Sequence, residues 1–84
     1  MKKKLKYDKK YLIDWVDSSA MGGIWCSYED LHSLCDTGHC QTIGWFNSEQ
    51  NGMLAFHSQR SRTGQCGGTM AIPRVAILKA KRIK

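Results

Sequence analysis

The chain has 84 residues, of which 42% are hydrophobic, and a net charge of +6 at pH 7. This length allows one domain with a small core and excludes a second domain or a deep, shielded catalytic cleft. No stretch reaches the roughly 20 apolar residues of a transmembrane helix, and the apolar run at 11–16 is too short for a signal peptide. We therefore expect a cytoplasmic chain without membrane contact, whose four cysteines are thiols.

The positive charge is concentrated at the two ends of the sequence. Residues 1–10 carry a net charge of +5 and residues 79–84 carry +4, whereas residues 11–78 carry −3. We predict a basic N-terminal tail over 1–10, followed by a single domain over 11–84. Basic ends often serve only to keep a chain soluble; contact with phosphates is the alternative.

The first predicted elements are a strand over 11–16 and a helix of about two turns that begins at Ser27. Serine and glycine residues predict a loop between them. The Ser27 hydroxyl can accept a hydrogen bond from the first turn of the helix, where acidic side chains follow. One face of the strand combines three bulky side chains, Tyr11, Ile13 and Trp15.

A hairpin is predicted next. A strand over 41–46 places Ile43 and Trp45 on one face. A turn over 47–52 follows and ends in Asn-Gly, a dipeptide typical of tight hairpins. A further alternating strand is predicted over 53–58.

The last third of the chain predicts a loop and two more strands. A glycine-rich loop over 61–68 leads to a strand over 69–72. Pro73 interrupts that strand and favours a one-turn 3₁₀ step. The final strand lies within 74–83, where alternation is expected for Val75, Ile77 and Lys79.

Together these elements predict a mostly β fold: a small SH3-like or Sm-like five-stranded barrel, with one short helix after the first strand. A closed or nearly closed barrel protects the sheet edges that a small β protein would otherwise expose. The first and last strands of such a barrel lie side by side. That arrangement would merge the two basic ends into one patch.

The sequence contains no recognised catalytic or cofactor motif. It has neither a nucleophile elbow nor a phosphate-binding loop ending in lysine, so we predict a protein that is not an enzyme, has no catalytic residues and needs no cofactor. The cysteines form no C-x-x-C pair, and we predict that they are small buried hydrophobes rather than metal ligands. Zinc held near Cys35, His39 and Cys40 is the alternative.

Two glycine-bearing loops are the predicted binding surfaces. Hydroxyls, free backbone N–H groups and arginines suit phosphate oxygens, and an aromatic ring can stack on a base. The alternative is that both loops are ordinary connectors and that Trp25 in the first loop is part of the core. The predicted ligand-binding residues are Asp17, Ser18, Ser19, Trp25 and Tyr28 in the first loop, Arg60, Ser61, Arg62 and Thr63 in the second, and Arg74.

Four short motifs resemble a family of small proteins encoded by tailed bacteriophages. They are W-V-D-S at 15–18, Trp25 before an acidic helix, I-G-W-F at 43–46 and A-I-P-R-V-A-I-L at 71–78. The resemblance implies a phage origin, an SH3-like or Sm-like fold and expression in the host bacterial cytoplasm. It also implies similarity to proteins that form homo-oligomers and sequester nucleotide signals of host immunity.

We therefore expect a non-enzymatic anti-defence protein that binds a phosphorylated ligand, such as a cyclic nucleotide, as a homo-oligomer. Two alternatives remain open. One is a nucleic-acid-binding barrel that uses its basic ends, and the other is an inhibitor that docks on a host protein.

Overall fold

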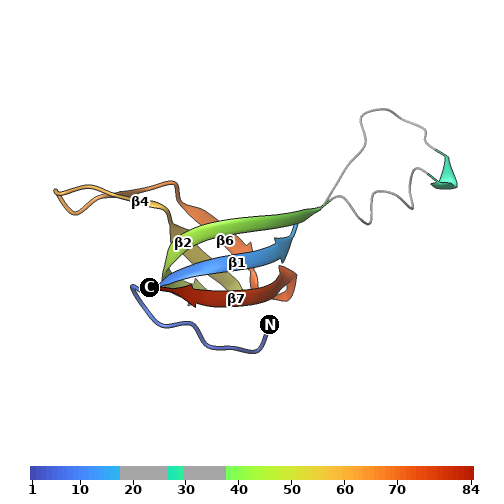
Figure 1. Ribbon diagram of the computed structural model, residues 1–84, viewed down its shortest axis with the longest axis horizontal. Helices are drawn as coiled ribbons and strands as arrows, with labels where there is room; N and C mark the ends of the chain where they lie inside the picture. The colour runs from blue at the N-terminus through green and yellow to red at the C-terminus, as the bar shows by residue number, and fades with distance from the viewer. Residues whose placement is uncertain (18–26, 30–37) are drawn as a thin grey trace.

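The computed structural model describes residues 1–17, 27–29 and 38–84. It shows a five-stranded antiparallel sheet, with strand order β6-β3-β2-β1-β7, and a separate two-stranded ribbon of β4 and β5 (Figure 1). The mostly β prediction is confirmed. The elements are β1 (Lys10–Val16), β2 (His39–Gln50), β3 (Met53–His57), β4 (Gln59–Arg60), β5 (Cys66–Gly67), β6 (Met70–Pro73), the 3₁₀ turn η1 (Arg74–Ala76) and β7 (Ile77–Ile83).

The first and last strands of the sheet lie side by side, as predicted. Lys10 pairs with Ile83 and Asp14 with Lys79 across β1 and β7. The expected closed barrel is not present, because β6 and β7 are the two edges of the sheet and do not pair with each other. Of the predicted helix, Tyr28 and Glu29 have helical conformation, and its remaining residues lie outside the described part of the chain.

The hairpin of β2 and β3 is longer than predicted. Strand β2 continues to Gln50, so the six-residue turn over 47–52 was wrong. The pairing shifts by one residue between Phe46 and Ser48, and this bulge absorbs the extra residue so that the strands continue to pair. The turn itself consists of Asn51 and Gly52, whose φ angles of 53° and 74° suit the tight turn that Asn-Gly favours.

The predicted glycine-rich loop over 61–68 is largely the tip of a second hairpin. Strands β4 and β5 pair Gln59 with Gly67 and Arg60 with Cys66. The Ser61 amide donates to the Gln65 carbonyl at 2.9 Å and closes the turn between them. Hydrogen bonding within the segment thus gives it a defined shape.

The 3₁₀ step after Pro73 is confirmed, but the expected alternation from Val75 into the last strand was wrong. The turn η1 rotates Val75 into solvent, where it is 93% exposed. Strand β7 begins at Ile77, which is buried, and its next buried residue is Ala80.

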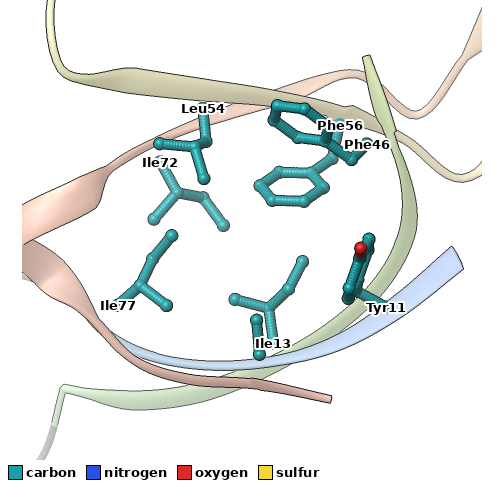
Figure 2. Packing of buried hydrophobic residues seen from close by; sticks show 8 residues of the cluster. Tyr11, Ile13, Phe46, Leu54, Phe56, Ile72 and Ile77 are labelled. Atoms are coloured by element: carbon teal, nitrogen blue, oxygen red, sulfur yellow. The ribbon is translucent and has the colours of Figure 1, made fainter. Parts of the chain in front are cut away.

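The core lies on the concave side of the curved sheet, where side chains from β1, β2, β3, β6 and β7 point toward one another (Figure 2). The predicted inward face of β1 is confirmed, because Tyr11 and Ile13 are buried and Trp15 packs against them. The Tyr11 hydroxyl accepts a hydrogen bond from the Lys6 amide at 2.9 Å, so this buried oxygen has a partner. The buried cluster consists of Tyr11, Ile13, Phe46, Leu54, Phe56, Ile72, Ile77 and Ala80.

Residues 1–9, expected as part of a basic tail, run along the body of the molecule (Figure 1). Met1 and Leu5 pack against the core, and the Lys3 ammonium donates to the Ala80 carbonyl at 3.1 Å. The two basic ends therefore lie next to each other: Lys10 pairs with Ile83 and the Lys3 ammonium also reaches β7. The Lys3 carbonyl in addition accepts a hydrogen bond from Arg74 of η1.

Candidate functional site

The convex side of the sheet, opposite the core, presents a mixed basic and aromatic surface. Register places Lys10, Trp45 and His57 in one row across β1, β2 and β3. Leu12 pairs with both Ile43 and Lys81, which gives a second row. Because directly paired residues share a face of a sheet, these side chains lie together. We call this surface the outer face; it comprises Lys10, Leu12, Asp14, Ile43, Trp45, His57, Lys79 and Lys81.

Trp45 is the centre of a compact cluster on the outer face. The His57 ring stacks beside the indole, with centroids 5.6 Å apart and planes inclined by 22°. The Arg60 guanidinium carbon lies 4.0 Å from the indole centroid, and the Lys10 ammonium lies 5.9 Å from it. Both cations are within the range of a cation–π interaction. We call Asp8, Lys10, Trp45, His57 and Arg60 the Trp45 cluster.

Two further contacts fix the orientation of the Arg60 guanidinium. Its Nε donates to Nε2 of His57 at 3.0 Å, and its Nη2 donates to the Asp8 carboxylate. The guanidinium thus lies over Trp45 with two of its donors already engaged.

Gly44 allows the two strands that carry Trp45 and His57 to approach closely. A Cβ at Gly44 would lie 3.1 Å from the His57 carbonyl oxygen and 3.3 Å from the Phe56 Cβ. Any larger residue would press β3 away from β2 at this point. The glycine therefore supports the stacking of Trp45 on His57.

A groove of about 530 Å³ opens beside the Trp45 cluster. Ala55 and Ala71 line it, and their small side chains leave room above the sheet. Tyr7, which is 70% exposed, and Arg60 also border the groove. Its volume lies within the roughly 300–1,000 Å³ typical of small-molecule sites.

Arg74, a predicted ligand-binding residue, is engaged in the structure itself. Its guanidinium donates to both carboxylate oxygens of Glu49, at 2.8 and 2.7 Å, and to the Met1 and Lys3 carbonyls at 2.9 and 2.8 Å. The hydrogen bonds from Arg74 lower the pKa of Glu49 below its ordinary value, and the same contact raises the pKa of Arg74. Arg74 follows Pro73, which pairs with Met53, about 13 Å along β3 from His57.

The second predicted loop reaches the site only in part. Arg60 and Ser61 line the groove, whereas Arg62 and Thr63 do not. The Ser61 hydroxyl accepts a hydrogen bond from the Gln65 amide at 3.0 Å and lies 3.0 Å from the Thr63 hydroxyl. These hydroxyls therefore serve the turn of the β4–β5 hairpin.

None of the described residues of the first predicted loop lies at the Trp45 cluster. Asp17 follows the end of β1, about 20 Å along that strand from Lys10, and the β4–β5 hairpin projects from the opposite end of the sheet (Figure 1). Tyr28 is 91% exposed. The other predicted residues of this loop, Ser18, Ser19 and Trp25, lie outside the described residues.

Asp8, Lys10, Trp45 and His57 were not among the predicted ligand-binding residues. A signal was present, because alternation correctly placed Ile43 and Trp45 on one face of β2. The inner face of that strand is formed by Gly44 and Phe46, both buried. A tryptophan on the face opposite a buried phenylalanine indicates a surface aromatic residue.

Residues 1–17, 27–29 and 38–84 contain no group of three or more His, Cys, Asp or Glu side chains placed to hold a metal ion. Cys40 and Cys66 are free thiols, but Cys40 is only partly buried and Cys66 is exposed, so the prediction of buried cysteines was wrong for both. Cys35 of the alternative zinc cluster lies outside the described residues. Among the same residues, no helix is long and apolar enough to cross a bilayer.

Comparison of the chain with protein-family models, with curated proteins and with solved structures gave no match.

Proposed function

We propose that the protein binds single-stranded nucleic acid on the outer face of its sheet. The observation that carries the proposal is the Trp45 cluster, in which an indole on the solvent side of the sheet is surrounded by Lys10, His57 and Arg60. Unpaired bases stack on aromatic rings and on guanidinium planes, and nearby cations attract the backbone.

The charges around the cluster favour a polyanion. Lys79 and Lys81 are exposed on β7 and lie on the same face, across β1 from Gln41 and Ile43, respectively. Asp14 opposes them, but its carboxylate accepts a hydrogen bond from the Gln41 amide at 2.8 Å. The outer face thus combines stacking groups with a net positive charge, the combination used by sequence-tolerant binders of single strands.

Fluorescence anisotropy with labelled single strands of about 15 nucleotides tests the proposal. We expect Trp45→Ala to weaken binding about 5- to 100-fold, because a stacked base contributes roughly 1–3 kcal/mol. The logarithm of the binding constant should fall with the logarithm of salt concentration with a slope of about −2, since three lysines of the outer face, Lys10, Lys79 and Lys81, can contact phosphates.

Two control variants make this experiment specific. Trp45→Phe retains an aromatic ring and should keep most of the affinity. Val75→Ala changes a residue that is 93% exposed in η1 and should leave binding unaltered. Absence of binding at low salt, or equal affinity of wild type and Trp45→Ala, would contradict the proposal.

A second candidate function is capture of a small phosphorylated ligand, and the groove beside Arg60 favours it. Its volume accommodates a nucleotide, and Arg60 and Ser61 line it. This proposal corresponds to a phage protein of the host cytoplasm that sequesters a cyclic-nucleotide immune signal as a homo-oligomer. It predicts a large rise in melting temperature with one member of a panel of cyclic di- and trinucleotides, and no rise with any of them would contradict it.

We also propose that the sheet is an SH3-type or Sm-type barrel left open between β6 and β7. The strand order, with first and last strands adjacent and a 3₁₀ turn before the last strand, supports this assignment. Residues 1–9 lie along the same body and supply Met1 and Leu5 to the core.

A further inference from the structure

We propose that Asp8 is an internal competitor for nucleic-acid phosphate, occupying the Arg60 guanidinium until a strand displaces it. This inference rests on the proposed function and concerns regulation of the same site. It assigns the Asp8–Arg60 pair a role in setting affinity and salt dependence.

The pair is placed where a backbone phosphate would bind. The Arg60 guanidinium carbon lies 4.0 Å from the Trp45 ring centroid, so a base stacked on this cluster brings its own phosphate close to the guanidinium. The guanidinium already donates to the Asp8 carboxylate. A carboxylate and a phosphate both accept hydrogen bonds from guanidinium N–H groups, and they compete for the same donors.

The pair is also weak enough to be displaced. The Arg60 and Asp8 side chains are 38% and 55% exposed, so solvent screens their attraction. Exposed ion pairs of this kind contribute little to stability. By contrast, Arg74 is 22% exposed, makes four hydrogen bonds and is not available to a ligand.

The local main chain holds Asp8 in this position. Its φ angle is 64°, a left-handed conformation that aspartate and asparagine tolerate better than most residues. Its amide donates to the Phe46 carbonyl at 2.9 Å, which anchors the turn over β2 beside Trp45. Asp8 is the single acidic residue among the six lysines of residues 1–10, so its carboxylate stands in an otherwise basic segment.

The test compares Asp8→Asn with wild type in anisotropy titrations of a labelled oligothymidylate at several salt concentrations. Asparagine tolerates the same φ, so the turn should be retained. We expect Asp8→Asn to bind about two- to fivefold more tightly near 0.15 M salt. Its salt slope should steepen by about 0.7, because Arg60 then neutralises one more phosphate and releases the cation condensed on it, with no Asp8 carboxylate left to attract a cation in turn.

Asp17→Asn is the matched control, because Asp17 follows the end of β1, about 20 Å along that strand from Lys10 and the Trp45 cluster. We expect it to leave the affinity within about 1.5-fold of wild type at the same salt, since charges beyond about 8 Å are screened. Equal effects of the two variants, or weaker binding by Asp8→Asn, would overturn the role of Asp8 alone. Failure of wild type and both variants to bind would instead overturn the proposed function.

Discussion

Two arginine–carboxylate pairs in this small protein look alike in sequence and differ in structure. Arg74 binds both oxygens of Glu49 and two main-chain carbonyls, so every contact holds η1, β2 and the N-terminal segment together. Arg60 contacts one oxygen of Asp8 and the His57 ring and covers Trp45 on the solvent side of the sheet. The first pair connects parts of the fold, whereas the second lies on an open surface.

The environment of an arginine, rather than its charge, therefore determines whether it can bind a ligand. Both residues were predicted to bind a phosphorylated group. Four of the five N–H donors of Arg74 are bound by the protein, so a ligand could use them only by breaking those hydrogen bonds, whereas an exposed ion pair is displaced with little loss of free energy. Arg60 is therefore the residue of the two that we place in the interface.

Removing each arginine in turn should have the largest effect and tests whether Arg60 serves binding and Arg74 serves stability. We expect Arg60→Ala to weaken single-strand binding about tenfold while changing the free energy of unfolding by less than about 0.5 kcal/mol. Arg74→Ala should do the reverse: it should lower the free energy of unfolding by about 1–2 kcal/mol, since a carboxylate and two carbonyls lose their donor, and leave the affinity of the folded protein unchanged. Urea denaturation and anisotropy measure the two quantities.

The same pair of variants can contradict the comparison. A loss of affinity for the single strand in Arg74→Ala, measured under conditions where the protein is fully folded, would show that Arg74 takes part in binding. A large loss of stability in Arg60→Ala would show that the Trp45 cluster supports the fold.

A smaller effect is expected of pH on the melting temperature, and it tests the structural role assigned to Arg74. Hydrogen bonding to Arg74 lowers the pKa of Glu49 in the folded state below its ordinary value of 4.5. The charged carboxylate therefore stabilises the fold fully above that value, and this contribution is lost as the pH falls through the lowered pKa. The melting temperature of wild type should exceed that of Glu49→Gln at pH 7, and the difference should shrink as the pH falls below 4.5. A difference that stays constant with pH would contradict this account.

Local patterns in the sequence predicted much of the fold. Alternation identified the buried face of Tyr11 and Ile13, the Asn-Gly dipeptide located the hairpin turn, and Pro73 located the 3₁₀ step. The bulge after Phe46 could not be predicted, because it depends on pairing with β3 and leaves no local sequence signal. The open edge between β6 and β7 likewise depends on the curvature of the whole sheet.

The candidate site was predicted less well than the fold. Arg60 was identified because it stands in a polar, glycine-bearing segment. The other members of the Trp45 cluster come from β1, β2, β3 and the turn before β1, and only strand register brings them together. The carboxylate that engages Arg60 is separated from it by 52 positions in the chain, so no local motif could connect the two.

The most direct test of the central claim is a nuclear magnetic resonance titration of the labelled protein with a single strand, following backbone amides, indole N–H groups and arginine Nε–H groups. We expect the resonances of the Trp45 indole, the Arg60 Nε–H and the amides of Lys10 and His57 to shift with one common binding curve, while that of the Arg74 Nε–H stays in place. Shifts centred on Arg74, or none on the outer face at saturating strand, would contradict it.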